Sequence, residues 1–129
     1  MELIFAALSI IILIYSSVLH EIAHGFVAYR LGDPTAKIQG RLTLNPIKHL
    51  DLYMSIILPL ILYFSTGGRF IFGGAKPVPV DPFNLRDGIK DLALVSLVGP
   101  LTNVSLAIIS SVLIHALYPE MSFNAVMND

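Results

Sequence analysis

The pattern His-Glu-x-x-His occurs once in this sequence, at His20, Glu21 and His24. On a helix, residues four apart lie on one face, so the two imidazoles can reach the same ion. A catalytic Zn²⁺ takes three protein ligands and one water molecule, and it lowers the pKa of that water to about 7. The pattern therefore predicts His20 and His24 as zinc ligands and Glu21 as the general base that activates the water.

These polar residues lie near the end of a long apolar segment, residues 3–31. Such a segment is long enough to cross a hydrocarbon core of about 30 Å. Ionisable side chains are costly in or beside a bilayer, so those found there usually mark function. A secretory signal is the alternative for residues 3–19, but no basic residue precedes them and no small-residue cleavage site follows. We interpret the segment as a membrane span that carries a metal site.

The composition also favours a bilayer. Of the 129 residues, 55% are hydrophobic and 13% are charged, whereas about 25% are charged in a soluble domain. The net charge of -1 gives no indication of a nucleic-acid partner. Cysteine is absent, which excludes disulfides and thiolate ligands and leaves His, Asp and Glu to hold any metal. We expect a multi-pass protein of the cell membrane, surrounded by the lipid bilayer.

Two further apolar segments follow, residues 52–65 and about 92–118. The first contains Pro59 and could either cross the bilayer or re-enter it. Residues 36–44 alternate apolar and polar side chains, which predicts a strand. The prolines among residues 76–82 predict an extended edge strand or loop. The sequence thus predicts an all-α membrane protein with about three transmembrane or re-entrant helical segments and short interspersed β-strands, forming one domain over residues 1–129.

Five short motifs resemble those of the site-2 protease family (family M50), and they occur in the family's order. They are residues 20–25 (HEIAHG), 29–36 (YRLGDPTA), 40–46 (GRLTLNP), 75–80 (AKPVPV) and 99–103 (GPLTN). The resemblance implies a zinc-dependent intramembrane endopeptidase that cleaves the transmembrane segments of substrate proteins. It implies the same roles for His20, Glu21 and His24 as their spacing predicts.

One departure from the family concerns the third zinc ligand. In the family this ligand is an aspartate in a Leu-Asp-Gly motif, on a helix beyond the part that matches residues 99–103. This sequence contains no Leu-Asp-Gly. We therefore expect the third ligand beyond residue 129, in a chain truncated at its C-terminus. Asp33, Asp51, Asp81 and Asp129 are weaker candidates, the last because chain ends are usually mobile.

Two other functions are open at this point. A catalytically inactive, truncated relative could act as a membrane binding module that keeps a substrate groove without turnover. A metal transporter or haem-binding helix pair could use the same histidines, but beyond Met54 and His115 the later apolar segments offer few ligands. Continuation of the reading frame into a Leu-Asp-Gly helix would distinguish the protease from the binding module.

Asn103 is the remaining candidate for a site role. By resemblance it lies near the active site, where its amide could hold the substrate carbonyl or a developing oxyanion. The alternative is a hydrogen bond between packed helices. Residues 76–80 could pair with an unwound substrate strand or form a rigid interfacial loop. We expect His49 among the headgroups rather than at the metal, and we rate His115 lower still.

Overall fold

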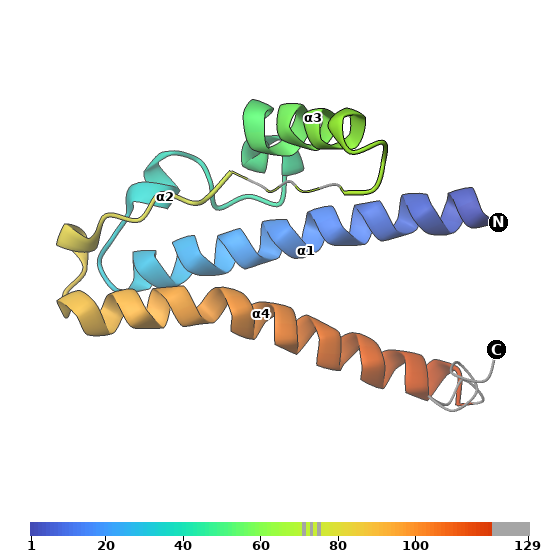
Figure 1. Cartoon of the computed structure of the whole chain (residues 1–129). Coiled ribbons are helices and arrows are strands. Elements are labelled where there is room, and N and C mark those ends of the chain that lie inside the picture. Colours follow the sequence, from blue (N-terminus) through green and yellow to red (C-terminus); the bar gives the residue numbers. More distant parts are fainter. Residues whose placement is uncertain (71, 73, 75, 120–129) are drawn as a thin grey trace.

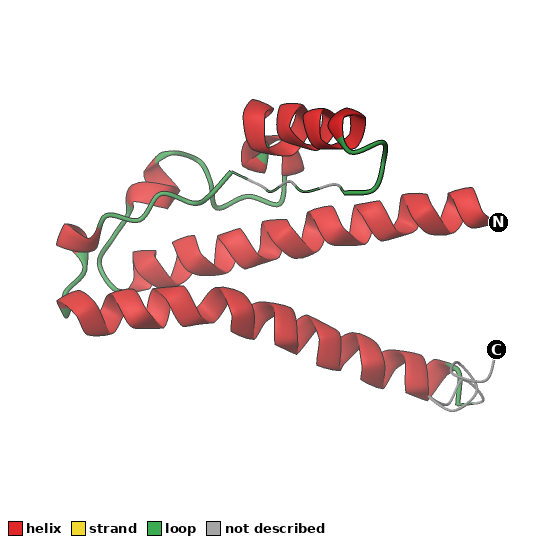
Figure 2. Ribbon diagram, viewed as in Figure 1, coloured by secondary structure: helices red, strands yellow, loops and turns green. Residues whose placement is uncertain are grey.

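Most of the chain is helical in the structure, a computed structural model that describes residues 1–119 apart from residues 71, 73 and 75 (Figure 1). The α-helices are α1 (Glu2–Arg30), α2 (Thr35–Ile38), α3 (Leu58–Ser65) and α4 (Gly88–Leu117). Three short helical segments join them: η1 (Pro46–His49) and η3 (Pro82–Asn84) are 3-10 turns, and η2 (Leu52–Ile57) is a π-helix. The described residues contain no strand (Figure 2).

The two long helices, α1 and α4, run antiparallel and diverge like the arms of a V (Figure 1). They contain 29 and 30 residues, and about 20 apolar residues suffice to cross a bilayer. Only 6% and 11% of their most apolar stretches is buried inside the protein. Their apolar side chains therefore face outward, as contact with lipid requires, and the two helices fit a membrane location.

The core lies at the closed end of the V, where α1 ends and α4 begins. Ala28, Leu85 and Val95 are buried there, and Val27, Leu31, Val80 and Leu92 pack against them. The two helices and the connection between them are therefore held together at one end, close to the His-Glu-x-x-His residues of α1.

A glycine cap ends α1 and turns the chain back along the helix. Gly32 has a φ of 112°, a conformation that favours glycine because other residues carry a Cβ. Its N–H donates to the carbonyl of Tyr29 at 3.2 Å, and the N–H of Asp33 donates to the carbonyl of Ala28 at 2.8 Å. This pair of bonds is the Schellman arrangement, which satisfies the last carbonyls of a helix.

The middle apolar segment is shorter than a membrane span. Helices η2 and α3 together cover Leu52–Ser65, and 14 residues of helix extend only about 21 Å, less than the ~30 Å of a hydrocarbon core. The structure thus gives two helices of spanning length, and the expectation of three spanning or re-entrant segments is not confirmed. The N–H of Lys76 donates to the carbonyl of His49 at 2.8 Å. The residues before and after this middle segment therefore lie side by side.

The prediction of short β-strands is wrong for the described residues. Within residues 36–44, the one-turn helix α2 follows Pro34, and Gly40 then turns the chain with a φ of 70°. The alternation of apolar and polar residues therefore belongs to a helical turn and a bend rather than to a strand. Residues 76–81, here called the extended segment, are extended but pair with no strand, because Pro77 and Pro79 have no N–H to donate.

The extended segment lies directly against α1. A Cβ built on Gly25 would be 2.7 Å from Leu42 Cδ2 and 3.1 Å from Val78 Cγ1. The absence of a side chain at Gly25 therefore lets the two connecting stretches approach the helix directly after His24. This close approach places the extended segment beside the residues that could do chemistry.

Candidate active site

His20 and His24 lie one helical turn apart on α1, on the side that faces α4. Their Nε2 atoms are 3.0 Å apart, and their rings meet edge to face with centroids 4.7 Å apart. Two nitrogens bound at 2.0–2.1 Å to one tetrahedral zinc would be about 3.3 Å apart. The two imidazoles therefore already stand within a few tenths of an ångström of a chelating arrangement.

The main chain of α4 orients the ring of His24. Its Nδ1 lies 2.5 Å from the carbonyl oxygen of Val95, and because a carbonyl only accepts, this nitrogen carries the proton. The other nitrogen, Nε2, then presents a lone pair toward His20. Metal-binding histidines commonly donate their second ring N–H in this way, which fixes both the tautomer and the direction of the ring.

Gly99 of α4 provides the space between the two histidines. The residue is buried, and a Cβ built on it would lie 2.6 Å from His20 Nε2 and still closer to His24 Nε2. Only glycine leaves room for an atom bound by both nitrogens. The cradle, the lone pair on His24 and the nitrogen spacing together fit a zinc ion held by these two residues.

Glu21 points toward the extended segment. Its Oε2 accepts a hydrogen bond from the N–H of Val78 at 3.0 Å. Glu21 and His24 share a cavity of about 310 Å³ with residues of the extended segment and of α4. The residues lining it from those two elements are Pro77, Val78, Val80, Leu92, Val95 and Ser96. A peptide lying in this cavity would contact the carboxylate and one of the two imidazoles.

The structure also brings Asn103 to this group. The residue lies four positions after Gly99 on α4, and it lines a second cavity, of about 320 Å³, together with His20 and Glu21. The four residues named from the sequence, at positions 20, 21, 24 and 103, therefore meet between the facing sides of α1 and α4.

The other sequence candidates lie away from the histidine pair. Asp51 and Asp81 each accept a hydrogen bond from the N–H two residues later, at the starts of η2 and η3. Asp129 lies outside the described residues. No group of three His, Cys, Asp or Glu that could hold a metal occurs among the residues that the structure describes.

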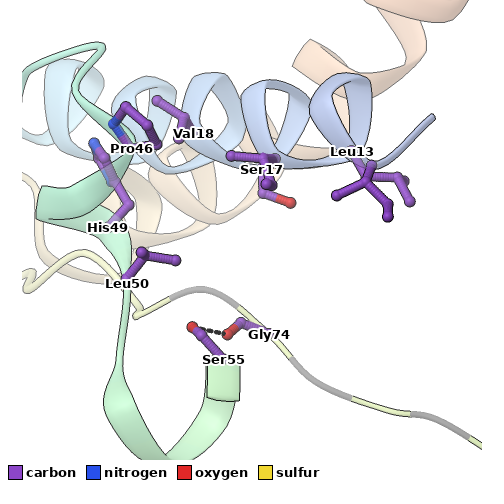
Figure 3. Close-up of a pocket in the computed structure, with 10 residues that line it drawn as sticks. Leu13, Ser17, Val18, Pro46, His49, Leu50, Ser55 and Gly74 are labelled. Carbon is purple, nitrogen blue, oxygen red and sulfur yellow. Dashed lines mark hydrogen bonds between the residues drawn. The ribbon is translucent and has the colours of Figure 1, made fainter. Parts of the chain in front are cut away.

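His49 and His115 take no part in the histidine pair. His49 is 1% exposed, and its Nε2 lies 2.8 Å from the carbonyl oxygen of Thr43. It lines a separate, largely apolar cavity with Leu13, Ser17 and Val18 (Figure 3). The expectation that the His49 ring lies among the lipid headgroups is thus wrong, because the ring is buried within the protein. His115 is exposed in the last turn of α4.

Asp33 binds the C-terminal end of the extended segment. The carboxylate is fully buried and accepts hydrogen bonds from the N–H of Asp81 at 2.8 Å, from Thr35 and from the amide of Asn84. Burial alone raises the pKa of this carboxyl, but the hydrogen bonds favour the ionised form more strongly. The pKa of Asp33 therefore lies below its ordinary value. The residue acts as an ionised anchor rather than as a metal ligand.

A histidine pair on the apolar helix α1, with Glu21 beside it and the apolar helix α4 facing it, is the kind of site found in zinc metallopeptidases. Comparison with known proteins identifies the family. A family profile named Peptidase family M50 matches residues 8–127. The chain therefore belongs to peptidase family M50, the site-2 protease family, whose members are membrane proteases.

Curated relatives of this chain carry protease names. It is 47% identical over 115 residues to the "Putative zinc metalloprotease YwhC" of Bacillus subtilis, a match that covers 87% of the chain and 48% of the relative. It is 37% identical over 91 residues to the "Putative zinc metalloprotease Rip2" of Mycolicibacterium smegmatis, covering 70% of the chain and 33% of that relative. The chain thus spans about half the length of the first and a third of the second. No solved structure matches it.

Sequence reasoning missed the main-chain groups of the site. The Val95 carbonyl and the Val78 N–H contact His24 and Glu21, and neither can be read from a side-chain pattern. The Gly-Pro pair at residues 99–100 was a signal for Gly99, since glycine in a helix interior costs stability and often marks a close approach.

Proposed function

We propose that this chain forms the metal-binding core of a zinc-dependent intramembrane endopeptidase. The observation that carries the proposal is the chelating geometry of His20 and His24, cradled at Gly99 and set on an apolar helix with Glu21 beside it. The protease names of the relatives support it and do not favour the inactive binding module. We further propose a multi-pass location in the cell membrane, because α1 and α4 both have spanning length.

Each residue of the site has a separate role in the proposed peptide hydrolysis. His20 and His24 bind the metal, and Val95 keeps His24 in the required tautomer. Zinc bound there would supply the Lewis acidity that polarises the scissile carbonyl and acidifies a water molecule. Glu21 takes the proton of the attacking water on its carboxylate and passes it to the nitrogen of the departing amine. The third ligand comes from a residue that the described part of the chain does not contain.

Asn103 is proposed to act on the substrate carbonyl. Its side-chain amide can donate a hydrogen bond, and it lines the same cavity as His20 and Glu21. A donor directed at the carbonyl oxygen stabilises the negative charge that develops during attack. Asn103→Ala should therefore lower turnover more than it weakens zinc binding.

The proposed substrates are transmembrane segments of other proteins. A helix resists proteolysis because its carbonyls are already bonded, so the substrate must be extended before attack. The extended segment offers an edge for such a strand, and its Val78 and Val80 line the cavity that holds Glu21 and His24. Pairing is limited to one side, since Pro77 and Pro79 carry no N–H.

The test is cleavage of a transmembrane peptide by the intact gene product in liposomes. The wild-type protein should cleave the peptide, whereas Glu21→Gln should bind zinc normally and lose at least about a hundredfold in rate. Glu2→Gln is the matched control, because Glu2 is exposed in the first turn of α1. Cleavage by Glu21→Gln at the wild-type rate would rule out the proposed mechanism.

A further inference from the structure

Arg41, which follows α2, is buried although it is charged. Only 5% of its surface is exposed, and burial of an uncompensated charge is costly. Its guanidinium donates to the carbonyl oxygen of Lys76 at 2.7 Å and to that of Pro77 at 3.3 Å. Within the described part of the chain, the single ion pair lies elsewhere, between exposed Lys90 and Asp87. Main-chain oxygens of the extended segment therefore satisfy the two terminal nitrogens of the buried guanidinium, whereas its Nε has no hydrogen-bond partner among the described residues.

One of these carbonyls belongs to the peptide group that holds Glu21. A peptide group is planar, and in the trans form its C=O and N–H point in opposite directions. The peptide bonds of the described residues are trans. Arg41 therefore contacts the oxygen of the Pro77–Val78 peptide group, while Glu21 accepts from its N–H at 3.0 Å. The side chains of Arg41 and Glu21 are therefore linked through this one planar peptide group.

The charges on the two sides suit the peptide dipole. A cation at the carbonyl oxygen and a carboxylate at the N–H both stabilise its orientation, and hydrogen bonds linked in this way strengthen one another. Arginine suits the place because its planar fork reaches two acceptors at once, whereas a lysine ammonium is a point charge on a flexible stem. No other N–H is available between residues 77 and 79, since both of these residues are proline.

We propose that Arg41 is a positioning residue for Glu21. It fixes the Pro77–Val78 peptide group, and the N–H of that group sets where the Glu21 carboxylate stands relative to His20 and His24. The inference rests on the proposed function, because it assigns the step at which Arg41 matters. It gives the motif at residues 40–46 a role in turnover rather than in metal binding.

The first test compares Arg41→Gln and Arg41→Lys in the intact protein. Arg41→Gln should lower kcat about tenfold, a part of the full contribution of a general base, while the zinc content and KM stay close to those of the wild type. Arg41→Lys should retain more activity, because its ammonium group keeps the positive charge and can still donate to a carbonyl oxygen. Arg69→Gln, which changes an exposed arginine after α3, should leave kcat unchanged.

A double-mutant cycle tests whether the effect passes through the Val78 N–H. Val78→Pro removes this donor and should lower kcat at least as much as Arg41→Gln. The double variant should then be no slower than Val78→Pro alone, because both changes break one chain of contacts. Hydrogen exchange should also quicken at the Lys76 and Val78 amides in Arg41→Gln, with α1 and α4 still protected.

The outcomes separate this inference from the proposed function. A wild-type kcat in Arg41→Gln, or fully additive losses in the cycle, would overturn the role of Arg41 alone. Loss of zinc together with activity in both Arg41 variants would assign the residue to folding and also overturn it. Absence of cleavage and of bound zinc in the wild-type protein would instead overturn the proposed function.

Discussion

At the scale of single residues, the site is defined by what is absent as much as by what is present. His20 and His24 supply two nitrogens, but the space between them exists because Gly99 has no side chain. The Val95 carbonyl then decides which nitrogen of His24 faces that space. The two ligand positions of the proposed metal site thus depend on two histidines of α1 and on two features of α4, Gly99 and the Val95 carbonyl.

Replacement of Gly99 by alanine tests this reading of the cradle. The new methyl group would lie 2.6 Å from His20 Nε2, well inside van der Waals contact, and would occupy the place of the metal. We expect Gly99→Ala to lose at least about tenfold in zinc affinity, as changes next to metal ligands commonly do. Equilibrium dialysis against zinc buffers measures this directly.

Gly74→Ala is the matched control for this substitution. A Cβ at Gly74 meets no atom within 4 Å, so this variant should bind zinc like the wild type. Unchanged zinc affinity in Gly99→Ala would show that the metal does not lie between the two histidines and the backbone of α4.

At the scale of elements, the connection between α1 and α4 is held by buried polar anchors. Asp33 fixes the end of the extended segment through the Asp81 N–H, and Arg41 fixes its start through two carbonyls. Both side chains are at least 95% buried. The segment that faces Glu21 is therefore positioned from both ends, without pairing to a strand.

Asp33→Asn should remove one of these anchors and a defined part of the acid sensitivity. The native pKa of Asp33 is lowered, so ionisation of this group stabilises the fold fully above its unfolded pKa of about 3.9 and ceases to do so as the pH falls through the native value. At neutral pH the variant should lose about 1–3 kcal/mol, because an amide cannot accept all of the donors that surround the carboxylate.

Denaturation of both proteins in detergent between pH 7 and pH 3 would measure the effect. The difference in unfolding free energy should be constant at neutral pH and should shrink once the pH falls below about 4. A difference that stays constant down to the lowest pH would contradict the lowered native pKa.

Much of this architecture could be predicted from the sequence, and the exceptions have physical reasons. The long helices followed from apolar runs of about 20 or more residues, because a helix satisfies all backbone hydrogen bonds of such a run within one segment. The strand expected at residues 36–44 failed because Pro34 and Gly40 enclose a single turn of helix, which a period of two over a few residues cannot exclude. The side chains of the site were found from their spacing, but its main-chain partners come from segments more than 50 residues away.

At the scale of the whole molecule, α1 and α4 form a V of antiparallel helices, and the connection between them begins and ends at its closed end. If α1 and α4 both cross, residues 37 and 86 lie on one side and residue 2 lies on the other. The chain contains no cysteine. A single cysteine introduced at a chosen position would therefore be the one thiol in this chain that a maleimide can label.

Labelling with a membrane-impermeant maleimide in sealed vesicles tests this arrangement. Lys37→Cys and Arg86→Cys, both at exposed positions, should be labelled from the same side. Glu2→Cys should be labelled only from the opposite side. Labelling of Glu2→Cys and Lys37→Cys from one side would show that α1 does not cross the bilayer.

The central claim is that His20 and His24 hold one zinc ion, and the zinc content of the purified intact protein tests it most directly. Metal analysis should give about one zinc per chain in the wild type, since three protein ligands and a water complete a catalytic site. His20→Ala and His24→Ala should each lose the metal, whereas His115→Ala, at an exposed position of α4, should keep it. One equivalent of zinc retained in either His20→Ala or His24→Ala, or none in the wild type, would contradict the account.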